Sequence, residues 1–243
     1  MTNSVLHKAH SRGYARHGWL ETHHTFSFAN YYDPHRMNFG VLRVMNDDII
    51  APSMGFGTHP HQNMEIITIP LEGQLEHKDS MGNQAVIETG EIQVMSAGKG
   101  VYHSEYNHSR THFVKLLQIW MFPNQQNVEP RYGELKLNPA DRHNRFQQIL
   151  SPNPEDAGVW VHQDAWFHLG TFQQNVDIEY VMKNKKNGLY VFIIQGSANI
   201  GEQLLERRDG YGIQNIEKIQ VHALEKTEIL LMEVPMDIRM RKG

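Results

Sequence analysis

The chain contains no cysteine among its 243 residues. Disulfide bonds and thiolate ligands are therefore excluded, and any metal must be held by histidine and carboxylate side chains. No apolar run approaches the roughly 20 residues that a membrane-spanning helix needs, and residues 1–13 lack the apolar segment of a signal peptide. We therefore expect a cytoplasmic protein that has no membrane partner.

An excess of basic residues is also absent. The 23 Lys and Arg residues are outnumbered by 27 Asp and Glu residues, which gives a formal net charge of -4. Because a domain that binds nucleic acid directly usually carries a basic surface, we expect no such partner. The apolar fraction of 40% is sufficient for a packed core. The length allows one large β domain or two of about 120 residues each.

Short apolar segments that alternate with turn signals make up most of the chain. The pattern predicts β-strands at 39–45, 64–71, 74–78, 84–88, 92–95, 113–122 and 189–194. The first of these is expected to end at a turn formed by Asn46, Asp47 and Asp48. One short helix is expected near 139–144. Regular turn signals at about ten-residue spacing favour an all-β sandwich or barrel.

The stretch from Pro123 to Pro154 is polar and contains further prolines. We interpret 126–153 as a region that connects an N-terminal domain, 1–125, to a C-terminal domain, 154–243. A weak repeat around Gly73 and Gly196 suggests that the two domains are similar, although chance similarity of two β domains would give the same pattern. The basic tail 237–243 is expected to be mobile or to form a short cap.

Two pairs of side chains stand at identical spacing: His59 and His61, then His103 and Glu105. In a strand, residues i and i+2 point to the same face, so each pair can place both side chains in one cavity. Together they form a four-ligand set of nitrogen and oxygen donors for a divalent transition metal. Glycines before each pair allow the backbone to turn sharply.

The donor set suits Fe(II), Mn, Ni, Co, Cu or Zn. Four ligands on an octahedral ion leave about two adjacent open positions, where a substrate oxygen and a small molecule such as O2 could bind. A tetrahedral zinc ion would instead be closed by four ligands, which would favour a structural role.

Other polar residues near these pairs are less specific. Glu65 could be a fifth ligand, could hold a ligand histidine from outside the coordination sphere, or could be an ordinary strand-end carboxylate; we favour the last two. For His77 we favour a structural role over a catalytic one, and for His23 and His24 we favour ordinary polar positions at a strand start over a pocket rim. Gln118 and Trp120 lie in an apolar strand. If its alternate residues face inward, some of them line the cavity, but core packing is the default expectation for most.

The two stretches resemble the two cupin motifs, the second seen as Gly100-Val101-Tyr102-His103-Ser104-Glu105-Tyr106-Asn107. The chain is more closely similar to the pirin family of cupins, in segments that include Leu71-Glu72-Gly73, Glu76 to Ser80, Met95 to Gly100 and Thr25 to Pro34. Within that family it resembles bacterial pirin-like proteins described as quercetin 2,3-dioxygenases. Ser96 departs from the cupin pattern, in which proline is usual, and the spacing to Gly73 is one residue longer.

The resemblance implies a bicupin, two β-sandwich barrels of which the N-terminal one holds a metal through His59, His61, His103 and Glu105. It also implies that Glu65 is not a ligand and that the C-terminal barrel is free of metal. Counting back from Gly196 puts Met182 and Asn184 in the places of His59 and His61, and His222 near the place of His103. We therefore expect one metal ion per chain and place Fe(II) first.

Three functions are compatible with these residues. The first is a metal-dependent dioxygenase that cleaves a flavonol-type ring with O2, in which Glu105 is both ligand and general base. The second is a redox-sensing regulatory protein of the pirin type, which binds a protein partner without turnover. The third is a structural or storage protein with a filled metal site.

Overall fold

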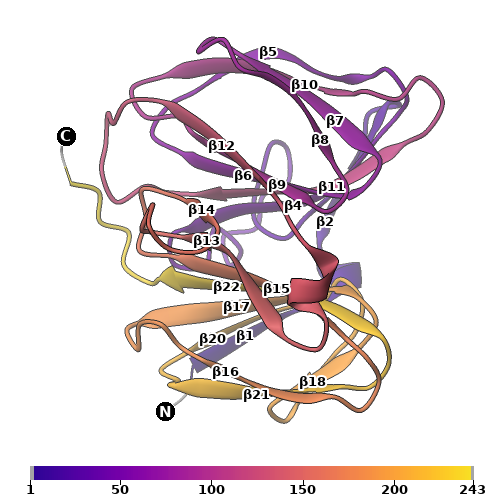
Figure 1. The fold of residues 1–243 in the computed structure, drawn as a ribbon, viewed down its shortest axis with the longest axis vertical. Coiled ribbons are helices and arrows are strands. Elements are labelled where there is room, and N and C mark those ends of the chain that lie inside the picture. The colour runs from indigo at the N-terminus through magenta and orange to yellow at the C-terminus, as the bar shows by residue number, and fades with distance from the viewer. Residues whose placement is uncertain (1–2, 242–243) are drawn as a thin grey trace. The chain divides into compact units, whose positions relative to one another are not determined.

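The computed structural model describes residues 3–241, which contain 22 β-strands and two short 3-10 helices (Figure 1). The prediction of an all-β protein is therefore confirmed. The predicted short helix corresponds to η2 (Pro139–Arg142), whose N-cap residue Asn138 accepts a hydrogen bond from the backbone of Ala140. No helix within residues 3–241 is long and apolar enough to cross a membrane.

The chain divides into two compact units. The N-terminal unit comprises residues 13–137, 159–163 and 238–241, and the C-terminal unit comprises residues 3–12, 138–158 and 164–237. Each unit contains a larger and a smaller antiparallel sheet, as expected for a β-sandwich.

The larger sheet of the N-terminal unit has the strand order β12 (Arg131–Lys136), β9 (Glu91–Ser96), β6 (Glu65–Glu72), β11 (Val114–Met121), β4 (Leu42–Ile50), β3 (Leu20–His24) and β2 (Gly13–Arg16). Its smaller sheet has the order β5 (Gly55–His61), β10 (Val101–Asn107), β7 (Gln74–Asp79) and β8 (Gln84–Glu88). The short strand β14 (Val159–Trp160) also belongs to this unit.

In the C-terminal unit, the larger sheet contains β1 (Asn3–His7), β20 (Gly210–Gln214), β17 (Asn187–Gln195), β22 (Thr227–Pro235), β15 (Trp166–Phe172) and β13 (Phe146–Ser151), in that order. The smaller sheet has the order β16 (Asp177–Val181), β21 (Lys218–Ala223), β18 (Ala198–Ile200) and β19 (Gln203–Leu205). The helix η1 (Ala9–Ser11) follows β1.

The observed division differs from the predicted domains at both ends of the first domain. Strand β1 pairs antiparallel with β20, so residues 3–7 belong to the C-terminal unit although they precede the N-terminal one. Strand β12 pairs with β9 and β13 pairs with β15, so the predicted connecting region 126–153 contributes one strand to a sheet of each unit. In the tail, Arg241 forms a bridge with Gln125, while residues 242 and 243 lie outside the described residues.

Strand β4 also differs from its prediction. The sequence Asn46-Asp47-Asp48 was expected to form a turn, but the strand continues through it to Ile50. Asn46 and Asp48 are buried, whereas Asp47 between them is half-exposed. The polar residues therefore follow the two-residue alternation of a strand, and those on the inner side face a cavity instead of an apolar core.

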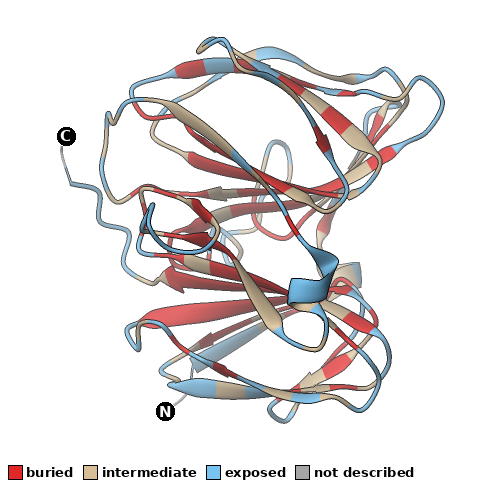
Figure 2. Ribbon diagram, viewed as in Figure 1, coloured by how far each residue is buried: buried red, intermediate tan, exposed pale blue. Residues whose placement is uncertain are grey.

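The interior of the C-terminal unit is closely packed with apolar side chains. Every residue of β17 except Gln195 is buried (Figure 2). A large cluster of buried apolar residues joins both sheets of this unit and includes Phe172, Leu189, Val191 and Leu231. The C-terminal unit therefore has the filled core that its apolar strands predict.

Candidate metal centre

The two predicted ligand pairs lie on adjacent strands of the smaller N-terminal sheet. Strands β5 and β10 are antiparallel, with His59 opposite His103. A bulge interrupts the pairing between His103 and Glu105, because Phe56 rather than Gly57 lies opposite Glu105. Gly55 makes the close approach of the strands possible, since a β-carbon there would lie 2.1 Å from the backbone oxygen of Glu105.

Local sequence explains why these side chains face inward. The residues of β10 alternate between buried and more exposed positions, and His103 and Glu105 are on its buried side, 2% and 3% exposed. Tyr102 and Tyr106 lie on the exposed side. Pro60 is tolerated between His59 and His61 because β5 is at the edge of its sheet.

Three imidazole rings converge inside the unit. The Nε2 atoms of His59 and His103 are 3.0 Å apart, and the ring centroids of His61 lie 4.9 Å and 4.8 Å from those of His59 and His103. The ligand atoms of all three residues lie within 4.8 Å of one another. A second group, formed by His77, His103 and Glu105, satisfies the same criterion, so Glu105 adjoins the cluster at His103.

Hydrogen bonds and burial prepare these rings to act as neutral ligands. The Nδ1 atom of His59 donates to the carbonyl oxygen of Gly57 at 2.8 Å, which leaves its Nε2 lone pair directed to the cluster. Burial, together with the neighbouring histidines, lowers the pKa of His61 to about 4, and burial lowers the pKa of His103 to about 3. Both rings are therefore uncharged at neutral pH.

These residues fit a divalent metal ion. The buried Nε2 atom of His61 has no hydrogen-bond partner among the described residues. Two imidazole nitrogens bound at about 2.1 Å to one ion, at right angles, would be about 3.0 Å apart, which is the separation of the His59 and His103 Nε2 atoms. The unsatisfied nitrogen of His61 and the close approach of the His59 and His103 Nε2 atoms both fit a cation among the three rings.

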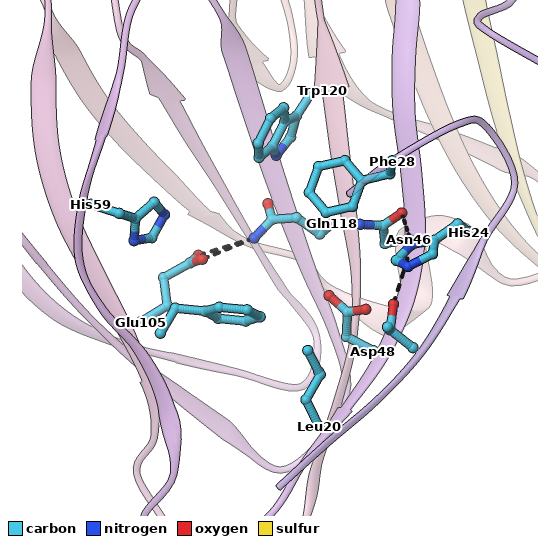
Figure 3. A pocket seen from close by; sticks show the side chains of 11 residues that line it. Leu20, His24, Phe28, Asn46, Asp48, His59, Glu105, Gln118 and Trp120 are labelled. Atoms are coloured by element: carbon cyan, nitrogen blue, oxygen red, sulfur yellow. Dashed lines mark hydrogen bonds between the residues drawn. The ribbon is translucent and has the colours of Figure 1, made fainter. Parts of the chain in front are cut away.

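Glu105 is held by side chains of the larger sheet. The amide nitrogen of Gln118 donates to both carboxylate oxygens, at 3.2 Å and 3.0 Å (Figure 3). The hydroxyl group of Thr68 lies 3.4 Å from one of these oxygens and donates to the side-chain oxygen of Gln118 at 3.1 Å. This network fixes the orientation of the Glu105 carboxylate, which lies beside His103 of the histidine cluster.

His77 and Glu65 are engaged elsewhere. His77 is fully buried, accepts a hydrogen bond from the Gln93 amide at 2.9 Å and donates to Asp79 at 3.2 Å, so both of its ring nitrogens are used. Glu65 is absent from the groups of converging ligand atoms, and it accepts a hydrogen bond from the Ser96 hydroxyl at 2.7 Å. Burial raises its pKa to about 7. Ser96, the departure from the cupin pattern, is therefore the partner of Glu65.

A cavity of about 180 Å³ adjoins Glu105 and His59. Its sides are mostly apolar and include Leu20, Phe28, Phe56 and Trp120. Trp120 packs edge-on against both His61 and Phe28. The wall opposite Glu105 is polar and is formed by His24, Asn46 and Asp48, as Figure 3 shows.

The sequence indicated only part of this cavity. Gln118 and Trp120 line it, although core packing was the default expectation for their strand. His24 lines it as well, whereas we favoured an ordinary strand-start position for this residue. Asn46 and Asp48 were missed because they were interpreted as a turn. The available signal was their two-residue spacing within an otherwise apolar strand.

The C-terminal unit contains different residues at the matching positions. The strand order β16-β21-β18-β19 corresponds to β5-β10-β7-β8, and Gly196 precedes β18 as Gly73 precedes β7. From the strand registers, we align Tyr180 and Met182 with His59 and His61, and Ile219 and Val221 with His103 and Glu105. The predicted equivalents, Met182 and Asn184, were thus displaced by two residues, and His222 faces away from this row.

Comparison with known families agrees with the two units. The family described as Pirin matches residues 6–121. The family described as Quercetinase C-terminal cupin domain matches residues 148–234.

Individual relatives cover almost the whole chain. The quercetin 2,3-dioxygenase of Escherichia coli (strain K12) is 41% identical over 231 residues, which are 95% of this chain and 98% of that protein. A pirin-like protein of Caulobacter vibrioides is 38% identical over 91% of this chain and 95% of its own length. The crystal structure of the bacterial pirin YhhW from Escherichia coli in complex with nickel(II) has a TM-score of 0.91 and 40% identity, covering 96% of this chain and 99% of that chain.

Proposed function

The chain belongs to the pirin family and has its bicupin fold, and on this premise we propose that it is a metal-dependent dioxygenase. The substrate class is a flavonol-type aromatic enol, which O2 cleaves with loss of carbon monoxide. The proposed ligands are His59, His61, His103 and Glu105, and Fe(II) is the metal that we place first. The C-terminal barrel is proposed to hold no metal.

One observation carries the proposal: His59, one of the three converging histidines, lines a cavity with aromatic walls together with Glu105. A structural metal site has no need of a cavity beside it, whereas a catalytic site must admit a substrate. Relatives that are 41% identical are named quercetin 2,3-dioxygenase, and a nickel(II) complex is known for YhhW. These names support an aromatic substrate, O2 and a metal for this chain as well.

A divalent metal held by this cluster would stabilise negative charge on a substrate oxygen and would bring the substrate and O2 together. The side chains of His59, His61 and His103 bind and orient that ion. Glu105 lines the cavity beside the histidine cluster, so we assign to it the acceptance of the substrate hydroxyl proton. Gln118 holds the Glu105 carboxylate by two hydrogen bonds and thus positions it for this transfer.

The cavity also limits how a flavonol could bind. A cavity of about 150 Å³ is known to hold one benzene molecule, so the 180 Å³ measured here accommodates one aromatic ring. Phe28 and Trp120 offer ring surfaces on the sides of this space. We infer that one ring of the substrate enters the cavity and that the rest remains toward its opening.

The test is anaerobic reconstitution of the metal-free protein with Fe(II), Mn(II), Co(II), Ni(II) and Cu(II) separately, because affinity alone does not identify the native metal. Each preparation is then followed in air for loss of quercetin and release of carbon monoxide. We expect both signals with at least one metal and neither without metal. Full turnover by the metal-free protein would refute the proposal.

A second candidate function has a structural basis in the outer face of β10. Tyr102 and Tyr106 are 57% and 41% exposed and alternate with His103 and Glu105 along the strand. A change at the metal could therefore reach an exposed aromatic surface of the kind that protein partners bind. If the chain binds one protein partner only in one oxidation state of the metal, and no flavonol is consumed, this regulatory role would be favoured.

The cytoplasmic location stays a prediction.

A further inference from the structure

The wall of the cavity opposite Glu105 carries a buried carboxyl group that the proposed chemistry does not use. Asp48 is 4% exposed and lines the cavity, and its carboxyl group points into it (Figure 3). The hydroxyl group of Thr22 donates a hydrogen bond to Asp48. The Oδ1 atom is buried and has no hydrogen-bond partner among the described residues.

The neighbours of Asp48 do not supply the missing partner. His24 donates from Nδ1 to the side-chain oxygen of Asn46 at 2.8 Å, so these two residues are paired with each other. The other cavity walls nearby are apolar, and Leu20 and Phe56 are among them. A buried acceptor without a partner destabilises a protein. A ligand group that paired with Asp48 would therefore recover this free energy on binding.

We propose that Asp48 is a substrate-recognition residue whose Oδ1 atom accepts a hydrogen bond from a hydroxyl group on the aromatic ring inside the cavity. This hydroxyl lies at the end of the ring system away from His59 and Glu105. The inference rests on the proposed function for its substrate class, hydroxylated flavonols. It adds that the cavity selects a ring that is itself hydroxylated.

A hydroxyl group suits this position better than other polar groups. Burial raises the pKa of Asp48 to about 7, so both protonation states of its carboxyl group are populated near neutral pH. A hydroxyl can donate to the ionised form and can accept from the protonated form. A methyl ether or a carbonyl oxygen could only accept, and would leave the ionised carboxylate unpaired.

The experiment is a set of anaerobic binding titrations with the nickel(II)-loaded protein, without O2 so that no turnover interferes. The probes are quercetin and flavonols that lack the hydroxyl groups of one ring or of the other. In the wild type, we expect removal of the hydroxyls from the ring in the cavity to weaken binding about 10- to 100-fold, the range for a hydrogen bond to a charged group. Removal from the other ring should have little effect.

Three variants make the test specific. In Asp48→Leu, of similar shape but without acceptors, the preference for the hydroxylated ring should fall below about threefold. In Asp48→Asn, which keeps a neutral acceptor and the most native-like side chain, the preference should be reduced about fivefold relative to wild type. Asp47→Asn is the matched control, because Asp47 is the adjacent half-exposed residue of the same strand, and its preference should equal that of the wild type.

The outcomes separate this inference from the proposed function. An equal preference in wild type, Asp48→Leu and Asp48→Asn overturns the inference, and ring cleavage observed alongside would leave the dioxygenase function intact. A preference that depends on Asp48 without any ring cleavage in air supports the recognition site and counts against the function alone. If no flavonol binds to the loaded wild-type protein, both are overturned.

Discussion

The smaller sheets of the two units follow the same strand order, but matching positions carry opposite kinds of side chain. The N-terminal sheet presents His59, His61, His103 and Glu105, where the C-terminal sheet presents Tyr180, Met182, Ile219 and Val221. Met182 and Val221 belong to the large apolar cluster of their unit. The same backbone plan can thus surround either a polar site or a filled core.

Both units contain buried polar atoms, some paired and some without a hydrogen-bond partner among the described residues. In the C-terminal unit, Tyr180 donates to Glu233 at 2.9 Å, and Glu233 also accepts from the backbone nitrogens of Lys183 and Asn184. In the N-terminal unit, polar atoms of His61 and Asp48 are buried without partners among the described residues. Such atoms lower the stability of a protein. Those of His61 and Asp48 lie in the candidate ligand cluster and in the wall of the adjoining cavity, where a ligand can pair with them.

The largest expected effect is on metal binding, when a histidine of the N-terminal unit is compared with one of the C-terminal unit. His103→Ala should lower metal affinity at least ~100-fold, since loss of residues that only support a ligand already costs 10- to 100-fold, and turnover should disappear with the metal. His222→Ala in the C-terminal unit is the matched control, because His222 is paired with Asp177 at 2.7 Å. Metal analysis of both purified variants provides the measurement. Normal metal content in His103→Ala would refute the ligand assignment.

The next effect separates binding of the metal from proton transfer within the N-terminal unit. Glu105→Gln keeps an oxygen ligand and the bonding partners of Gln118, so we expect part of the metal to be retained. Loss of the base should lower kcat about 10²- to 10⁴-fold, the usual contribution of general base catalysis. Single-turnover rates are measured per bound metal ion, so that metal loss is not counted. An unchanged rate per metal ion would show that Glu105 is not the base.

A smaller effect is expected on the free energy of unfolding, when a leucine of the filled C-terminal core is compared with one beside the N-terminal cavity. Leu231 is fully buried in the C-terminal cluster, so Leu231→Ala should lower the free energy of unfolding by about 2–5 kcal/mol. Leu20 already borders the N-terminal cavity, so Leu20→Ala should cost less, about 2 kcal/mol or below. Urea denaturation followed by circular dichroism measures both changes. Equal losses would contradict the difference in packing between the units.

The sequence was informative wherever apolar alternation was regular. The strand predicted at 84–88 coincides with β8, and those at 74–78 and 113–122 correspond to β7 and β11 within one residue at each boundary. The two pairs with two-residue spacing identified the converging histidines, because a strand places residues i and i+2 on one face. These features depend on local geometry, which sequence patterns report directly.

Long-range pairing and the polar cavity wall were not accessible in this way. Nothing local in residues 3–7 indicates that β1 pairs with β20 about two hundred residues later. Asn46 and Asp48 have turn-forming side chains, but they lie in a strand that pairs with β3 on one side and β11 on the other. The C-terminal equivalents were displaced by two residues because the alignment was counted along the chain instead of across paired strands.

The smallest effect tests a buried imidazole that has no proposed metal beside it. In the C-terminal unit, burial and, to a smaller extent, the charge of Lys183 lower the pKa of His168 to about 3. Between its ordinary pKa of about 6.5 and pH 3, the unfolded chain therefore binds a proton that the folded chain does not. The stability contribution of neutral His168 is complete above pH 6.5 and declines as the pH falls below it, by at most about 1.4 kcal/mol per pH unit.

The variant His168→Leu removes this proton binding, so its free energy of unfolding should depend less steeply on pH between 6.5 and 4.5 than that of the wild type. His222→Gln is the control, because His222 is only half-buried and is hydrogen-bonded to Asp177 at 2.7 Å. The difference between variant and wild type at each pH is the relevant quantity, since the N-terminal histidines contribute equally to both. Parallel curves would mean that burial alone does not hold His168 neutral. A flatter curve would show that the fold can keep an imidazole uncharged by packing, which is the state that His61 and His103 need before a metal binds.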